Sequence, residues 1–345
     1  MSKTLIFGGT GSLGRKLIER FLPDGEVAVY SRDEAKHWTI KNELQSGPLS
    51  SKLNDLQFYV GDVRDLNRIR DVLRQYKPGR VIIAAALKQV DTCELSPSES
   101  VLTNLIGTQN VINAIHELGS YSGVTAVLFV STDKACSPVN VYGMCKAISE
   151  RVVTSQAQTG IKWIRYLAVR YGNVLESRGS IIPLFKYQGM YGTQLTVTDP
   201  NMTRFLMTLD DSVDLIQTAL NSGVSGETWL PRLPSMKVGD LANIFAEKYG
   251  KPIKIIGLRP GEKQHEDLIN ESEGVRTRIT DDGKNYVIGP AYIAGSGKAF
   301  TYTSADDVMS SAKLFLHLDK LGIIDKPLNQ FTGQKIEEIA TNRKE

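Results

Sequence analysis

Five side chains suited to hydrogen bonding and proton transfer lie between residues 132 and 146. Tyr142 and Lys146 are one turn apart if this segment is helical, and they then share one face. A cation there favours the phenolate, so Tyr142 can take a proton from an alcohol near neutral pH. This pair suits alcohol oxidation by hydride transfer, although it also fits a solvated helix face. Thr132, Asp133 and Lys134 add a hydroxyl, an acid and a base, and eliminating water needs such an acid and base.

A glycine-rich turn follows the first expected strand at residues 4–7. Its glycines are spaced G-x-x-G-x-x-G, and a helical pattern follows through residue 21. Residues without Cβ let the backbone approach a pyrophosphate at the helix N-terminus. The strand-turn-helix context favours a dinucleotide site over a turn without a ligand. The expected contacts are Gly8, Thr10, Gly11, Ser12, Leu13 and Gly14.

The second expected strand, residues 26–30, ends next to Ser31, Arg32 and Asp33. An acidic residue there accepts the ribose 2′-hydroxyl of NAD, whereas serine and arginine receive the 2′-phosphate of NADP. We expect NADP, bound through Ser31 and Arg32. NAD is the alternative, and Arg32 then serves as a solvated surface charge.

Further candidate contacts follow the next expected strands, at residues 56–60 and 81–83. The first would form one edge of an adenine pocket, and small side chains after the second let the backbone lie close to the cofactor. A fifth strand, residues 124–130, leads into the Thr132 segment. Sites in open parallel sheets lie at the carboxyl ends of strands, which is where all these residues fall. The candidates are Asp62, Val63, Ala84, Ala85 and Ala86.

Strands alternate with helical patterns up to a sixth expected strand at residues 163–169. This alternation predicts an α/β fold with a Rossmann-type doubly wound parallel sheet. Beyond it, short helices and strands mix with Gly, Pro and basic residues. We therefore expect a cofactor-binding domain with the catalytic residues at 1–175. A smaller α/β lobe at 176–345 would bind the substrate, with some segments interleaved.

The composition is that of a globular enzyme. The 345 residues can bury a sizeable core, and 41% hydrophobic and 23% charged residues are ordinary values. No apolar run approaches the roughly 18 residues of a membrane span, and we expect no signal peptide. A net charge of +3 gives no argument for nucleic acid. Three spaced cysteines indicate the cytoplasm, and four scattered histidines give no metal site.

Basic residues in the loops of the second half are suited to a diphosphate. Arg178, Arg204 and Arg259 lie in segments rich in Gly, Pro and polar residues. A guanidinium binds phosphate oxygens bidentately. Structural salt bridges are the alternative role for these arginines.

A set of motifs, taken in order, resembles the inverting UDP-N-acetylglucosamine 4,6-dehydratases of the extended short-chain dehydrogenase/reductase superfamily. These enzymes make precursors of pseudaminic acid and of 2-acetamido-2,6-dideoxy-L-sugars for surface polysaccharides. The resemblance is dense over residues 1–270 and loose over the last 75. The motifs are Gly-Gly-Thr-Gly-Ser-Leu-Gly at 8–14, Gly-Asp-Val-Arg-Asp at 61–65, Ala-Ala-Leu-Lys-Gln-Val at 85–90, Ser-Thr-Asp-Lys-Ala at 131–135, Arg-Tyr-Gly-Asn-Val at 170–174, Ser-Arg-Gly-Ser-Ile-Ile-Pro-Leu-Phe at 177–185, Met-Thr-Arg-Phe at 202–205 and Arg-Pro-Gly-Glu-Lys-Gln-His-Glu at 259–266.

The resemblance implies a role for each matching residue. Tyr142 and Lys146 act in the hydride step, and Thr132 hydrogen-bonds the sugar 4-hydroxyl. Asp133 protonates the departing 6-hydroxyl, and Lys134 is the base where related glucose 4,6-dehydratases have a glutamate. A capsule-type branch, which has methionine in place of Tyr142, is also similar over residues 143–146 and 302–304. Substrate contacts are implied for Lys88, Asn173, Arg178, Arg204, Arg259 and Glu262, and Lys88 and Asn104 would also lie near the nicotinamide.

The implied reaction places two demands on the acid and base. Hydride leaves C4 while Tyr142 takes the hydroxyl proton, and the new ketone acidifies C5–H. Lys134 then removes that proton while Asp133 protonates the 6-hydroxyl. Hydride returns to C6, and C5 is reprotonated from the opposite face. We therefore expect a raised pKa at Asp133 and a lowered pKa at Lys134, from burial and from nearby Lys146.

The expected substrate is UDP-N-acetylglucosamine, and the resemblance implies a homo-oligomer, either a dimer or a hexamer. A UDP-N-acetylhexosamine 4-epimerase is the main alternative, because it needs the Tyr–Lys pair and the cofactor. It does not need Asp133 and Lys134, which favours the dehydratase. A C5-retaining dehydratase shares nearly every motif. A cofactor-binding scaffold or redox sensor would not need Thr132, Tyr142 and Lys146.

Overall fold

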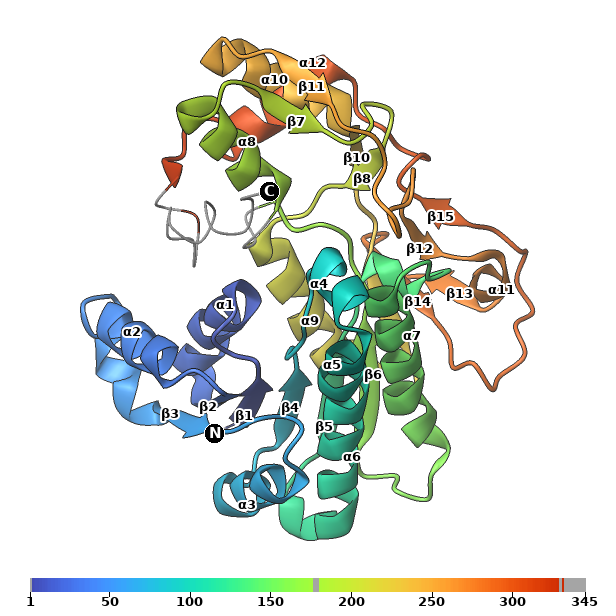
Figure 1. Ribbon diagram of the computed structural model, residues 1–345. Helices are drawn as coiled ribbons and strands as arrows, with labels where there is room; N and C mark the ends of the chain where they lie inside the picture. The colour runs from blue at the N-terminus through green and yellow to red at the C-terminus, as the bar shows by residue number, and fades with distance from the viewer. Residues whose placement is uncertain (1, 176–179, 329–330, 332–345) are drawn as a thin grey trace.

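The computed structural model describes residues 2–175, 180–328 and 331 (Figure 1). Its centre is a nine-stranded sheet in the order β13-β14-β9-β6-β5-β4-β1-β2-β3. Strands β1 to β6 and β9 pair in parallel, while β14 and β13 continue the sheet antiparallel. The predicted Rossmann-type doubly wound sheet is confirmed. The strands are β1 (Ser2–Phe7), β2 (Gly25–Ser31), β3 (Leu56–Val60), β4 (Arg80–Ile83), β5 (Ala126–Val130), β6 (Arg165–Val169), β9 (Thr228–Pro231), β13 (Thr277–Ile279) and β14 (Asn285–Ile288).

Helices cover both faces of this sheet because its strands are apolar on both sides. In β5, Leu128 and Val130 pack into the core on one face, whereas Val127 and Phe129 pack on the other. The first core is closed by α1 (Ser12–Phe21), α2 (Glu34–Gln45) and α9 (Leu209–Ser222), and the second by α3 (Leu66–Tyr76), α6 (Gly107–Leu118) and α7 (Val141–Thr154). Two strands begin two residues later than predicted, because Val124 and Trp163 precede the first paired residues of β5 and β6.

A smaller lobe lies beyond the carboxyl ends of the central strands (Figure 1). It has its own apolar core, which includes Phe185, Phe245 and Leu314. Its elements are α8 (Ile181–Tyr191), β7 (Leu195–Val197), β8 (Thr203–Phe205), β10 (Ser235–Lys237), α10 (Val238–Tyr249), β11 (Ile253–Ile255) and α12 (Ser311–Lys320). Further elements are α4 (Val90–Leu95), α5 (Pro97–Ser100), β12 (Asp267–Ile269), α11 (Glu271–Gly274) and β15 (Tyr302–Thr303).

The second half of the chain contributes to both bodies. Strands β9, β13 and β14 join the large sheet, although they follow residue 175 in sequence. The lobe is therefore built from interleaved segments, and the division at 175 stays a prediction. Within the described ranges, no helix is long and apolar enough to cross a membrane, and no cluster of His, Cys, Asp and Glu is arranged to hold a metal ion.

Candidate active site

A cavity of about 1180 Å³ lies at the carboxyl ends of the parallel strands, facing the lobe. Every residue of the predicted Thr132–Lys146 catalytic set lines it. Its wall also holds nearly all of the predicted cofactor contacts. These are Gly8, Thr10, Gly11, Ser12, Leu13, Gly14, Ser31, Arg32, Asp62, Val63, Ala84, Ala85, Ala86 and Lys88.

The glycine turn is shaped for close backbone approach. Gly8 has φ +83°, a conformation that favours glycine, and a Cβ there would lie 2.6 Å from Ala85 Cα. A Cβ on Gly14 would lie 2.4 Å from the backbone of Gly9, so this glycine packs α1 against the turn. The first turn of α1 has no side-chain cap and no acidic residue. Its amides therefore suit an anion such as a pyrophosphate.

Basic and polar side chains gather where β2 ends. Ser31 Oγ lies 2.7 Å from His37 Nε2, and Arg32 is 57% exposed, 3.7 Å from Asp62. Arg15 and Lys36 also line this part of the cavity. The arrangement fits the phosphate-bearing end of a dinucleotide, and the identity of that dinucleotide stays a prediction.

The Thr132 segment leads from β5 into α7. Thr132 Oγ1 donates to Asp133 Oδ1 at 2.9 Å, and Asp133 Oδ2 is buried without a hydrogen-bond partner among the described residues. Burial raises the pKa of Asp133, with Lys134 opposing the rise and Glu266 adding to it. The expected direction for Asp133 is therefore found. Gly143 admits α7 to this segment, because a Cβ there would lie 2.2 Å from the Lys134 carbonyl oxygen.

The lowered pKa expected for Lys134 is wrong for this structure. Lys134 Nζ donates to Asp133 Oδ1 at 3.2 Å and to Glu266 Oε1 at 2.9 Å. Burial alone would lower the pKa of Lys134, but these two carboxylates raise it above the usual value. The cation that acts in the opposite sense is Arg204, not Lys146. Sequence analysis missed this outcome because Glu266 comes from the lobe, far along the chain.

Tyr142 and Lys146 lie on one face of α7, as the spacing predicts. Lys146 Nζ donates to the Val130 carbonyl oxygen and lies 3.9 Å from the centre of the Phe129 ring. Burial lowers the pKa of Lys146 to about 7 and raises the pKa of Tyr142 to about 12. The expected effect of Lys146 on Tyr142 is therefore not found, because the cation that opposes the rise in the pKa of Tyr142 is Lys134.

The predicted substrate contacts fall into two groups. Asn173, Arg259 and Glu262 line the large cavity, and Arg259 lies 3.6 Å from Asp91 on α4. Arg204 is buried instead, and its guanidinium donates to the carbonyl oxygens of Thr203, Lys263 and Gln264. Arg178 lies outside the described residues.

Asn104 is the predicted cofactor contact that does not line the large cavity. Its side chain is buried, accepts from the Leu87 amide at 2.8 Å, and donates to the Leu87 carbonyl oxygen at 3.0 Å. Asn104 therefore holds the loop that carries Ala86 and Lys88, and its contact with the cofactor stays a prediction.

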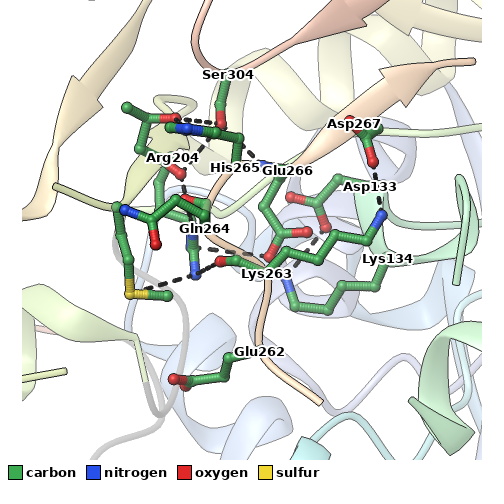
Figure 2. Close-up of polar contacts among 12 residues, drawn as sticks. Asp133, Lys134, Arg204, Glu262, Lys263, Gln264, His265, Glu266, Asp267 and Ser304 are labelled. Atoms are coloured by element: carbon green, nitrogen blue, oxygen red, sulfur yellow. Dashed lines mark hydrogen bonds and ion pairs between the residues drawn. The ribbon is translucent and has the colours of Figure 1, made fainter. Parts of the chain in front are cut away.

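A second, smaller cavity of about 110 Å³ opens beside Lys134. Asn140, Asn173, Arg204 and Glu266 line it, and Figure 2 shows Glu266 next to Lys134 and Asp133. Glu266 lies in this cluster, although the sequence did not single it out as a candidate site residue. The one available signal was its place at the end of the 259–266 motif.

The sequence of this chain is similar to those of nucleotide-sugar enzymes. UDP-glucose 4-epimerase of Rickettsia prowazekii is 38% identical over 315 residues, covering 86% of this chain and 89% of the relative. UDP-N-acetylglucosamine 4,6-dehydratase (inverting) of Campylobacter jejuni is 38% identical over 288 residues, covering 82% and 80%.

Solved structures agree on the fold. Pen from Bacillus thuringiensis has a TM-score of 0.85 at 32% identity, covering 93% of this chain and 98% of that one. The dTDP-glucose 4,6-dehydratase DesIV of Streptomyces venezuelae, with NAD and TYD bound, has a TM-score of 0.64 at 23% identity, covering 76% and 86%. The sequence pattern of one family matches residues 4–288, and the chain therefore belongs to the family described as polysaccharide biosynthesis protein.

Proposed function

We propose that this chain is a UDP-N-acetylglucosamine 4,6-dehydratase that inverts C5. The observation that carries the proposal is the direct contact between an acid and a base, Asp133 and Lys134, beside Tyr142 in one cavity. The relative from Campylobacter jejuni bears that activity in its name. The product would be a UDP-2-acetamido-2,6-dideoxy-hexos-4-ulose for surface polysaccharide or glycan synthesis.

The glycine turn and the Ser31–Arg32 corner fit a nicotinamide dinucleotide. Arg32, with Arg15 and Lys36 nearby in the cavity wall, supports NADP over NAD. When bound, the nicotinamide accepts hydride from C4 of the sugar and returns it to C6. Because the cofactor ends as it began, we propose that it stays bound through turnover.

Tyr142 would take the proton of the 4-hydroxyl during oxidation at C4. Thr132 Oγ1 donates to the carboxyl of Asp133, and Thr132 lines the same cavity as Tyr142. Its hydroxyl would hold the 4-oxygen of the sugar over Tyr142. Lys146, fixed on Val130 at the end of β5, would hold the nicotinamide ribose close to the same face.

Asp133 and Lys134 would carry out the elimination. The 4-ketone makes C5–H acidic enough for the Lys134 amine, provided that the amine is neutral. Asp133 lines the cavity next to Lys134, and its carboxyl is available to protonate the 6-oxygen. Burial raises the pKa of Asp133, which favours the protonated carboxyl that this step needs.

The lobe would bind the UDP moiety. Arg259 is 36% exposed at the cavity wall, paired only loosely with Asp91 and Glu262 at 3.6 and 3.9 Å. A diphosphate would replace these carboxylates, since bidentate phosphate contacts are stronger. We propose Lys88, Asn173, Arg178, Arg204, Arg259 and Glu262 as the substrate contacts.

A homo-oligomer in the cytoplasm completes the proposal. Leu102 and Ile106, in the segment that leads into α6, are each 40% exposed, and on the adjoining α7 Met144 and Ile148 are 47% and 51% exposed. Contiguous apolar surface of this kind is typical of protein interfaces. A dimer or hexamer formed through it is tested by sedimentation or light scattering.

A 4-epimerase is the second candidate, because the Rickettsia relatives carry that name at the same identity. An epimerase requires Tyr142 and the cofactor, but it does not need Asp133 or Lys134 as an acid or a base. A C5-retaining dehydratase is the third, since it differs only in the face of reprotonation.

Incubating the purified protein with UDP-N-acetylglucosamine and reading the product by NMR separates these candidates. A C6 methyl group with a 4-ketone supports the dehydratase, and the configuration at C5 decides between inversion and retention. A C4 epimer that keeps its 6-hydroxyl would overturn the proposal.

A further inference from the structure

Glu266 is brought to the catalytic lysine from the small lobe. Its Oε1 accepts from Lys134 Nζ at 2.9 Å, although the two residues are 132 positions apart. Two hydrogen bonds join Ser304 to the backbone of Glu266 (Figure 2). Ser304 Oγ accepts from the Glu266 amide at 2.9 Å, and the Ser304 amide donates to the Glu266 carbonyl oxygen at 2.8 Å. The backbone of Glu266 is therefore held independently of Lys134, and Arg204 Nε lies 3.7 Å from its Oε1.

Glu266 reaches the chemistry only through Lys134. The side chains of Glu266 and Asp133 are 3% and 1% exposed, whereas that of Lys134 is 21% exposed. Asp133 and Lys134 line the large cavity, but Glu266 lines only the small one. Its second oxygen, Oε2, is buried without a hydrogen-bond partner within the described part of the chain. The proposed elimination uses only Asp133 and Lys134, and Glu266 has no role in it as an acid or a base.

The ionised forms of Lys134 and Asp133 are not the forms that elimination needs. In the ionised site the ammonium of Lys134 lies between the carboxylates of Asp133 and Glu266. Elimination needs a neutral amine and a protonated Asp133. Moving one proton from Lys134 Nζ to Asp133 Oδ1, across the 3.2 Å bond, supplies both at once. One N–H bond breaks, one O–H bond forms, and the net charge stays the same.

The difference between the carboxyls of Glu266 and Asp133 determines which of them accepts the proton from Lys134. Burial alone would raise the pKa of Glu266, but the cations of Lys134 and Arg204 lower it. Arg204 Nε lies 3.7 Å from Glu266 Oε1, so a cation stays beside Glu266 when Lys134 becomes neutral. Burial raises the pKa of Asp133 instead. The proton leaving Lys134 is therefore directed to Asp133, the carboxyl that must donate it to the 6-oxygen. Glu266, still ionised, keeps one N–H of the neutral amine and leaves the lone pair of nitrogen for C5–H.

We propose that Glu266 is a positioning residue that orients Lys134 and sends its proton to Asp133. The inference rests on the proposed dehydratase function. Lys134 then takes the proton from C5, and the proton on Asp133 leaves with the 6-hydroxyl as water. The pair returns to its ionised form, so Glu266 needs no net change of its own.

Charge and position are separated by two substitutions. Glu266→Gln keeps an oxygen that can accept from Lys134 but removes the negative charge. Removing that charge lowers the pKa of both members of the Asp133–Lys134 pair, so both limbs of the kcat–pH profile move to lower pH together. Glu266→Ala removes position as well, and kcat falls by roughly ten- to a hundredfold, with KM nearly unchanged.

Two further variants test the position of Glu266 and serve as a control. Ser304→Ala loosens the backbone of Glu266 without altering its charge, so kcat falls while the limbs of the pH profile stay where they are. Glu271→Gln, an exposed carboxylate on α11, is the matched control and leaves both kcat and the profile unchanged. Melting temperatures and cofactor binding of all four proteins show that each is folded.

The outcomes distinguish this inference from the proposed function. If the wild type forms no 6-deoxy product, the proposed function fails. If it forms the product and the profile of folded Glu266→Gln coincides with that of the wild type, the positioning role of Glu266 fails alone. If Glu266→Gln does not fold, an unchanged kcat in Ser304→Ala overturns the inference.

Discussion

The amine of Lys146 donates its hydrogen bond to the carbonyl oxygen of Val130, the last residue of β5. This contact fixes the lysine to the sheet, where burial lowers its pKa to about 7. The phenol of Tyr142, one turn away, has a pKa raised by burial to about 12, and the cation opposing that rise is Lys134. Lys134 therefore influences the pKa of Tyr142 as well as that of Asp133.

Tyr142→Phe should lower turnover by roughly 10²–10⁴, because it removes the proposed general base while leaving the ring in place. Cofactor affinity, measured by fluorescence titration, should stay close to that of the wild type. Near-normal turnover would show that the phenol is not the base. Lys134 would then be the candidate base for both steps.

Lys134→Ala should stop elimination and still allow oxidation at C4. In deuterium oxide, the wild type should place solvent deuterium at C5 of the product, while C6 receives the hydrogen that began at C4. The variant should show no exchange at C5, and a transient rise in reduced-nicotinamide absorbance should report C4 oxidation. A C4 epimer without deuterium at C5 would instead favour the epimerase.

The sequence predicted this site where its residues follow strand ends. Thr132, Asp133 and Tyr142 could be placed together because the carboxyl ends of parallel strands meet at one edge. The protonation of Lys134 could not be predicted, because it depends on Glu266, which the lobe folds back onto the sheet. Local sequence patterns do not predict contacts between residues that are 132 positions apart, such as Lys134 and Glu266. Asn104 shows the same limit, since only the fold reveals that its amide holds Leu87.

Arg32→Ala should weaken binding of NADP and leave binding of NAD nearly unchanged. A charge-assisted hydrogen bond contributes about 1.5–3 kcal/mol, which corresponds to roughly tenfold to more than a hundredfold in affinity. Calorimetric titration with each cofactor measures both values. Lys52→Ala, in the short 3-10 helix Ser50–Asp55 of the same domain and outside the cavity wall, is a suitable control. Equal losses for both cofactors would assign Arg32 a structural role through Asp62.

Gly143→Ala should impair both stability and turnover, because its Cβ would lie 2.2 Å from the Lys134 carbonyl oxygen and must displace the segment that carries Asp133. Overpacking of this kind costs about 1–3 kcal/mol of unfolding free energy. Gly160→Ala is the matched control, since a Cβ there meets nothing within 4 Å. Denaturant unfolding and kcat measure the two effects. Equal stabilities of the two variants would show that α7 can move away without cost.

Glu273 on α11 ties the lobe side of the molecule to the sheet through Arg170. Arg170 Nη1 and Nη2 donate to its two carboxylate oxygens at 2.8 and 2.9 Å, and both side chains are nearly fully buried. Burial alone would raise the pKa of Glu273, but Arg170 lowers it to about 2 from the ordinary 4.5. A lowered acid pKa contributes stability above about pH 4.5 that is lost as pH falls towards 2.

Glu273→Gln should therefore reduce the unfolding free energy by about 3–5 kcal/mol at neutral pH, because Arg170 loses one of its two buried carboxylate partners and keeps only Glu150. The difference from the wild type should shrink as pH falls from about 4.5 towards 2, where the wild-type carboxylate also becomes protonated. Glu271→Gln, two residues away and exposed, should match the wild type at every pH. Urea unfolding over this pH range measures the difference. A difference that stayed constant down to pH 2 would mean that the charge of Glu273 does not stabilise this junction, and that the loss arises from packing alone.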